Sequence, residues 1–111
     1  MELLIIILNH EDHFYSLIPL LQEKGIHGGT ILDSEGLAST LLQESDDSRL
    51  RYLRSMFNQG RPYNKTILLL LNEDMVEVAK TCVREVVGDI SHENTGILFT
   101  LPVSSFEGLT K

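Results

Sequence analysis

The chain has 111 residues, 42% of them hydrophobic and 23% charged, which is the composition of one folded globular domain spanning residues 1–111. Its formal net charge of −7 disfavours binding to nucleic acid, and its longest apolar run, Leu3 to Leu8, is far shorter than the roughly 18 residues of a membrane span. The single cysteine, Cys82, excludes an internal disulfide, and Glu2 stands where a secretory signal would be basic, so we expect a cytoplasmic protein.

An aliphatic run that ends in asparagine occurs twice, at residues 4–9 and 67–72. Acidic residues follow each asparagine closely, and a glycine, Gly25 or Gly88, lies at the same distance beyond it in both copies. This order predicts a buried strand, then a helix that is capped by the asparagine and ended by the glycine. The chain is therefore predicted to contain two copies of a strand–helix unit.

The first helix is predicted from an apolar stripe, formed by Phe14, Leu17, Ile18 and Leu21 at the i, i+3, i+4, i+7 spacing of one buried face. Pro19 lies inside this stretch, where it removes a backbone hydrogen bond. We therefore expect a bend in the helix or a late start near Leu17.

A second extended segment, residues 30–33, precedes a long connection at residues 38–63 that interrupts the repeat. Capping residues at 45–48 and apolar residues at helical spacing predict a short extra helix from about 46 to 57 in this connection. We expect residues 38–61 to be mobile and to face a partner. The arginines of this segment are Arg49, Arg51, Arg54 and Arg61. They either pair with nearby acidic residues or form a docking surface for an anionic ligand or partner.

The second helix carries the stripe Met75, Ala79, Cys82, Val83 and Val86, and a last strand follows at residues 96–101. Two tandem β-α-β units predict an α+β domain of ferredoxin-like βαββαβ topology, with a four-stranded antiparallel sheet and two helices on one face. Strands as apolar as residues 3–8 and 67–71 need cover on both faces, so we expect the chain to self-associate.

Two stretches resemble PII nitrogen-regulatory proteins. Residues 25–36, with Gly25, Gly28, Gly29, Thr30 and Gly36, are similar to the second strand of that family, and residues 96–103, which end in Pro-Val, are similar to its last main strand. The resemblance implies a homotrimer that binds a small ligand in clefts between subunits and acts on a regulated enzyme or membrane transporter through the loop after the second strand. It implies signalling and no enzymatic activity.

Carried over by position, the resemblance assigns the ligand-binding role to Gly28, Gly29, Thr30, Gly36, Asn94, Thr95 and Gly96. The family's phosphate-binding lysine falls on Ile97, its arginines on Gly108 and Thr110, and the acidic residue of its third strand on Leu68. A nucleotide is a possible ligand, but each lost charged contact weakens binding by about tenfold or more. We therefore expect a Kd for ATP above about 100 μM and an effector that is small or singly charged. Arg61 or Lys65 could supply a replacement cation.

Three alternative functions, metal binding, acylphosphatase activity and RNA binding, each require particular residues. His10 and His13 are spaced to share a metal ion, but the sequence offers no third ligand, and Glu11 and Asp12 are more simply explained as helix-start residues. A metal-binding or structural trimer is the alternative function. An acylphosphatase needs an arginine and glycines in the first turn, where residues 9–12 read Asn-His-Glu-Asp. RNA-binding domains of this topology need exposed aromatic side chains on the central strands, which here are aliphatic.

Overall fold

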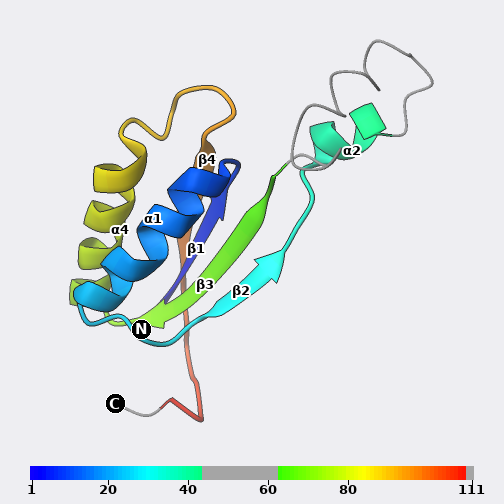
Figure 1. The fold of residues 1–111 in the computed structure, drawn as a ribbon. Helices are drawn as coiled ribbons and strands as arrows, with labels where there is room; N and C mark the ends of the chain where they lie inside the picture. The colour runs from blue at the N-terminus through cyan, green and yellow to red at the C-terminus, as the bar shows by residue number, and fades with distance from the viewer. Residues whose placement is uncertain (44–62, 110–111) are drawn as a thin grey trace.

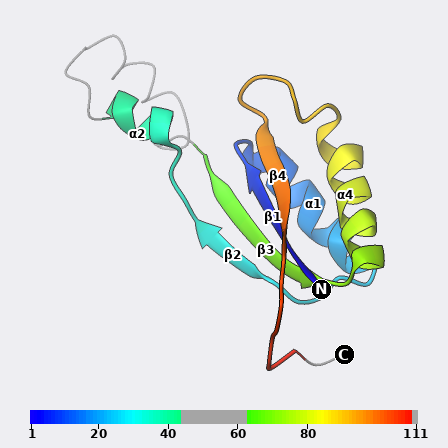
Figure 2. The ribbon, with the colours of Figure 1, turned by 180° about the vertical axis from the view of Figure 1, so that it is seen from behind.

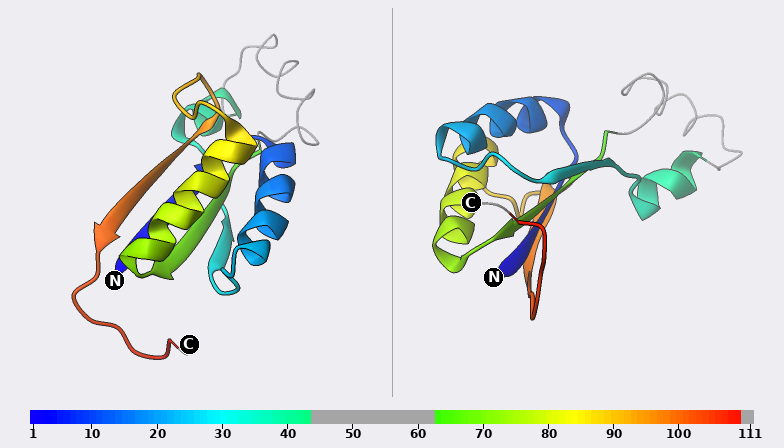
Figure 3. Two further views of the ribbon diagram at one scale, coloured as in Figure 1. Left: turned by 90° about the vertical axis from the view of Figure 1, so that its left-hand side faces the viewer. Right: turned by 90° about the horizontal axis from the view of Figure 1, so that it is seen from below.

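A computed structural model describes residues 1–43 and 63–109. The elements are β1 (Glu2–Leu8), α1 (Glu11–Glu23), β2 (Thr30–Asp33), α2 (Leu37–Gln43), β3 (Lys65–Leu71), α4 (Glu73–Val87) and β4 (Gly96–Pro102). The strands form a 4-stranded antiparallel sheet in the order β2-β3-β1-β4. Helices α1 and α4 lie side by side on one face of this sheet (Figures 1 and 3). The predicted ferredoxin-like fold is confirmed.

The core lies between the sheet and the two helices. Leu4 of β1 pairs with Leu69 of β3, and Ile6 pairs with Ile67, so alternate residues of the central strands point toward the helices. All four side chains are buried. The helices contribute the apolar stripes that their spacing predicted: Phe14, Leu17, Leu21, Ala79, Cys82 and Val83 are buried, and Ile18, Met75 and Val86 pack against them. Burial raises the pKa of the Cys82 thiol.

Helix α1 begins at Glu11 and continues past Pro19, so the expected late start near Leu17 is wrong. Pro19 is exposed, whereas Leu17 and Leu21 on either side of it are buried against the sheet. A proline in a helix removes one backbone hydrogen bond. Burial of Leu17 and Leu21 stabilises both turns around it, because each large apolar side chain contributes about 1.5–3 kcal/mol.

The asparagines of the two repeats have different roles. Asn72 caps α4, since its side chain accepts a hydrogen bond from the Met75 backbone N–H at 2.9 Å. Asn9 does not cap α1: the N-cap is His10, whose side chain makes no capping bond, so this part of the prediction is wrong. The Asn9 side chain instead accepts a hydrogen bond from Asn64. Asn9 thus bonds to Asn64, which is distant in sequence, and does not make the helix cap that the local pattern predicted.

The connection between β2 and β3 contains helix α2, which the sequence pattern did not predict at this place. Its first turn is held by Thr40, whose backbone N–H and hydroxyl both donate to the carbonyl of Gly36 at 2.9 Å. The helix predicted at about 46–57, and with it Arg49, Arg51, Arg54 and Arg61, lies outside the described residues.

Neither α1 nor α4 covers the opposite face of the sheet (Figure 2), and large apolar side chains lie on it. On the edge strand β4, Ile97, Phe99 and Leu101 are 53%, 39% and 48% exposed, and Leu32 of β2 is 46% exposed. The odd-numbered residues of β1 face the same side, because Ile5 pairs with Phe99 and Ile7 pairs with Ile97. Within the described residues, no helix is long and apolar enough to cross a membrane.

Candidate ligand-binding site

The predicted ligand-binding residues are spread over both edge strands of the sheet and both of its ends. Gly28, Gly29 and Thr30 lead into the edge strand β2, and Thr30 pairs with Leu68 in the middle of β3. Gly96 begins the other edge strand, β4, where it pairs with Leu8 at the end of β1. Strands β3 and β1 separate the two edges. One chain therefore does not bring these residues together into a single pocket.

Gly96 allows a close approach of β4 to the end of β1. Its φ is 156°, a conformation that side chains rarely adopt, and a Cβ at this position would overlap the carbonyl oxygen of Ile7. Gly29 serves a similar purpose at the other edge, because a Cβ there would lie 3.0 Å from the carbonyl oxygen of Leu68. Both predicted ligand glycines thus have a packing role in their own chain.

The turn before Gly96 is ordered by a carboxylate. Asp89 accepts hydrogen bonds from the Ser91 backbone N–H at 3.0 Å and from the Ser91 hydroxyl at 2.6 Å. These bonds lower the pKa of Asp89. Asn94 is exposed and has a positive φ of 57°, whereas Thr95 is buried. Asn94 can therefore meet a ligand with its side chain, and Thr95 serves the fold.

Sequence reasoning missed Asp89 as the residue that shapes this turn. The spacing Asp89-Ile90-Ser91 is that of an Asx turn, in which an aspartate side chain accepts from the backbone two residues later. This local signal was sufficient to find it.

A polar network joins the two ends of the 34–64 connection to the turn before β4. Ser34 donates its hydroxyl to the side-chain oxygen of Asn64, and the Asn64 amide donates to Asn9 at 2.8 Å. The Asn9 backbone N–H in turn donates to the carbonyl of Thr95 at 3.2 Å. The Ser34 hydroxyl also lies 2.8 Å from that of Thr66. The network crosses the end of the sheet at which Gly36 and Gly96 lie.

Lys65 is placed beside this network. Its ammonium group forms an ion pair with Asp33, and its nitrogen lies 5.8 Å from the ring centre of Phe14 and 6.0 Å from that of Tyr63. The Tyr63 hydroxyl is buried and lacks a hydrogen-bond partner in the described part of the chain. Burial, aided by the negative charges of nearby groups, raises the pKa of Tyr63 to about 12. At this end of the sheet the charge of Lys65 is thus paired with the carboxylate of Asp33.

The rings of His10 and His13 lie 5.0 Å apart, centroid to centroid. The described residues include no group of three or more histidine, cysteine, aspartate or glutamate side chains that could hold a metal ion. The pair is therefore in contact but lacks a third ligand from the described part of this chain.

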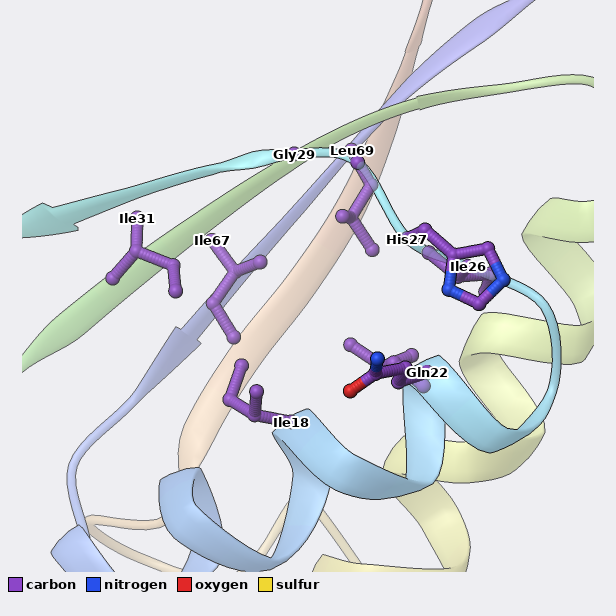
Figure 4. Close-up of a pocket in the computed structure, with 10 residues that line it drawn as sticks. Ile18, Gln22, Ile26, His27, Gly29, Ile31, Ile67 and Leu69 are labelled. Atoms are coloured by element: carbon purple, nitrogen blue, oxygen red, sulfur yellow. The ribbon is translucent and has the colours of Figure 1, made fainter. Parts of the chain in front are cut away.

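A pocket opens between α1 and the β2 edge of the sheet, on the helix side (Figure 4). Its volume is about 230 Å³. Apolar side chains from α1, β2 and β3 form most of the lining, and Gln22 and His27 are its polar side chains. Gly28 and Gly29 of the predicted ligand-binding set also line it, which the sequence did not indicate.

The fold is similar to that of a solved structure. A crystal structure of Arabidopsis thaliana PII bound to citrate superimposes with a TM-score of 0.62 at 17% sequence identity, over 93% of this chain and 74% of that chain. The chain has the PII fold. No family model and no curated protein matches the sequence.

The structure places two positions that the sequence resemblance aligns with charged residues of the PII family, Ile97 and Leu68. Ile97 is exposed and Leu68 partly buried, and both lie on the open sheet face, because Ile5 pairs with Leu68 and Ile7 pairs with Ile97. Both positions are apolar. In the described part of the chain, this face is suited to packing and not to holding phosphate.

Proposed function

We propose that this chain is a PII-like regulatory protein: a homotrimer that senses a small ligand in clefts between subunits and has no catalytic activity. The observation that carries the proposal is the open apolar sheet face of a PII-type fold, on which Ile97, Phe99 and Leu101 leave large side chains exposed. Such a face on a folded domain marks an interaction surface.

Self-association explains two features together. It covers the open face, and it allows Gly28, Gly29 and Thr30 of one subunit to meet Gly36, Asn94 and Gly96 of another, as a ligand cleft between subunits requires. Light scattering on the purified protein at micromolar concentration tests this step. We expect the mass of a trimer, and a monomer would contradict the proposal. Phe99→Glu should produce a monomer, because it places a charge on the covered face.

The ligand is expected to be small or singly charged. The cleft retains backbone donors and the side chain of Asn94, but Ile97 stands where the family has its phosphate-binding lysine. A thermal-shift screen with ATP, ADP, 2-oxoglutarate, bicarbonate, citrate and divalent metals tests this, since a ligand that binds the native state raises the melting temperature. A Kd for ATP in the low micromolar range by titration calorimetry would contradict it. Loss of such binding in Lys65→Ala or Arg61→Ala would identify the substitute cation.

Residues 38–61 are proposed to contact the regulated enzyme or transporter. The support is their position between β2 and β3, where PII-like proteins carry their effector loop, and the arginines Arg49, Arg51, Arg54 and Arg61. Once a partner is found, replacing Arg49, Arg51 and Arg54 together by alanine should weaken binding and reduce its salt dependence. Unchanged binding would show that these arginines only pair with local acidic residues.

A metal-binding trimer is the second candidate, favoured by the contact between the rings of His10 and His13. A third ligand would have to come from another subunit or from a residue outside the described ranges. Calorimetry with zinc decides between the two: binding that is lost in His10→Ala and in His13→Ala would support the metal site. Absence of zinc binding would contradict the metal site and leave ligand sensing as the proposed function.

A further inference from the structure

The pocket between α1 and the β2 edge is large enough for an aromatic side chain. Its volume is about 230 Å³, and an apolar cavity of about 150 Å³ is known to accept benzene. Ile18 lies on the helix side of the pocket, and Ile31, Ile67 and Leu69 lie on the strand side (Figure 4). Ile31 is 48% exposed, so part of this lining faces solvent in the single chain. The pocket is therefore suited to an apolar group that enters from the β2 edge.

The C-terminal segment offers such a group. After β4, the Val103 N–H donates to the carbonyl of Met1 at 3.1 Å, and the chain then leaves the end of the sheet (Figures 1 and 2). Beyond this point Phe106 and Leu109 are each 47% exposed. This short segment extends past the sheet and exposes two large apolar side chains. They form an anchor that a complementary pocket on another surface would bury.

The anchor and the pocket belong to opposite edges of the same sheet. The segment follows β4, whereas the pocket lies against β2, with β1 and β3 between them. At about 4.8 Å between neighbouring strands, β2 is roughly 14 Å from β4, and four extended residues span at most about 14 Å. Phe106 could approach the pocket of its own chain only if the segment ran straight across the sheet. Instead it leads away from the sheet.

We propose that Phe106 of one subunit occupies the α1–β2 pocket of a second copy of this chain. This inference rests on the self-association proposed above and names a contact that holds the copies together. A contact between opposite edges of successive subunits is head-to-tail, and such contacts close into a ring when the rotation allows it. It is thus compatible with a trimer.

Charged residues lie near both the segment and the pocket. Glu107 directly follows Phe106, and the connection from α1 to the pocket contains Lys24 and His27, both exposed. Glu23 is the acidic residue of that stretch. When Phe106 enters the pocket, Glu107 comes to its rim, where Lys24 can attract it.

Tryptophan fluorescence tests the contact, because the chain contains no tryptophan. The variant Phe106→Trp places one reporter on the segment, and Leu37→Trp places a matched reporter on α2, where the native side chain is 81% exposed. We expect blue-shifted emission from Phe106→Trp in the assembled protein and a red shift when dilution dissociates it. Leu37→Trp should emit at long wavelength throughout.

A second change locates the pocket. Ile31→Glu adds a carboxylate to the pocket lining at an exposed edge position, so combining it with Phe106→Trp should return the tryptophan emission to long wavelength. Glu107→Lys provides an independent variant that leaves the pocket residues unaltered and should weaken assembly. Phe106→Ala should raise the dissociation constant for self-association at least about tenfold, whereas Leu37→Ala should not change it.

Three results would overturn the inference. Long-wavelength emission from Phe106→Trp in a protein that light scattering shows to be assembled would reject the contact and leave the proposed trimer intact. Blue-shifted emission that persists in a monomer would show that the chain fills its own pocket. Blue-shifted emission that Ile31→Glu leaves unchanged in a folded, assembled protein would place Phe106 elsewhere.

Discussion

The side-chain amide of Asn64 donates a hydrogen bond to the side-chain oxygen of Asn9 at 2.8 Å, which joins the start of β3 to the end of β1. Asn64 also accepts from the Ser34 hydroxyl, and Asn9 donates its backbone N–H to Thr95. Two asparagines thus connect the base of the 34–64 connection with the turn that precedes β4.

Asn9→Ala should destabilise the fold by about 1–2 kcal/mol, because it leaves the partly buried amide of Asn64 without its partner. Asn64→Ala should cost a similar amount. The double variant should cost less than the sum of the two, and urea unfolding at one fixed protein concentration measures all three. Strictly additive losses would mean that the two side chains do not interact.

Asn72→Ala should destabilise the protein by about 1 kcal/mol through loss of the α4 cap. His10→Ala is the matched change at the start of α1, and it should cost less at the cap because the His10 side chain makes no capping bond. Thermal unfolding of both variants measures the difference. Equal losses would contradict the assignment of Asn72 as the capping residue.

Gly96→Ala should destabilise the fold by more than about 3 kcal/mol, because a Cβ would overlap the Ile7 carbonyl and residues with side chains rarely adopt this backbone conformation. Gly88 also has a positive φ, of 77°, but has open space around it. Gly88→Ala should therefore cost only about 1–2 kcal/mol. If the two variants unfolded at the same denaturant concentration, the close approach at Gly96 would be unimportant.

Ionisation of Tyr63 should make stability fall at alkaline pH. The pKa of this side chain is about 12 in the folded chain, against an ordinary tyrosine pKa of 10.0, so the unfolded state releases the proton first. The contribution of protonated Tyr63 to the free energy of unfolding is fully present below pH 10 and is lost as the pH rises toward about 12. Absorbance of the phenolate during a pH titration measures the ionisation directly.

Tyr63→Phe is the control for the alkaline titration, because it removes the ionisable group and keeps the ring. It should abolish the step near pH 12 and leave stability at neutral pH unchanged or slightly higher, since the buried hydroxyl has no partner among the described residues. A step near pH 12 that survived in Tyr63→Phe would assign it to another tyrosine of the three in the chain.

Local patterns in the sequence were sufficient for the architecture. The apolar stripe through Phe14, Leu17 and Leu21 and its counterpart through Ala79 and Val83 identified both helices and their buried faces. The repeated strand–helix order predicted the sheet, because tandem β-α-β units have few ways to pair their strands. The apolar residues on both sides of β1 and β3 likewise predicted the open face.

Tertiary contacts decided what the same patterns could not. Asn9 and Asn72 occupy equivalent places in the repeat, yet only Asn72 caps its helix, because Asn64, far away in sequence, lies within reach of Asn9. The pocket at Gly28 and Gly29 depends on how α1 packs against the β2 edge, which no periodicity encodes. Sequence alone determined which faces of this protein are apolar. The tertiary structure decided which polar side chains meet, because those contacts depend on sheet register between residues far apart in the chain.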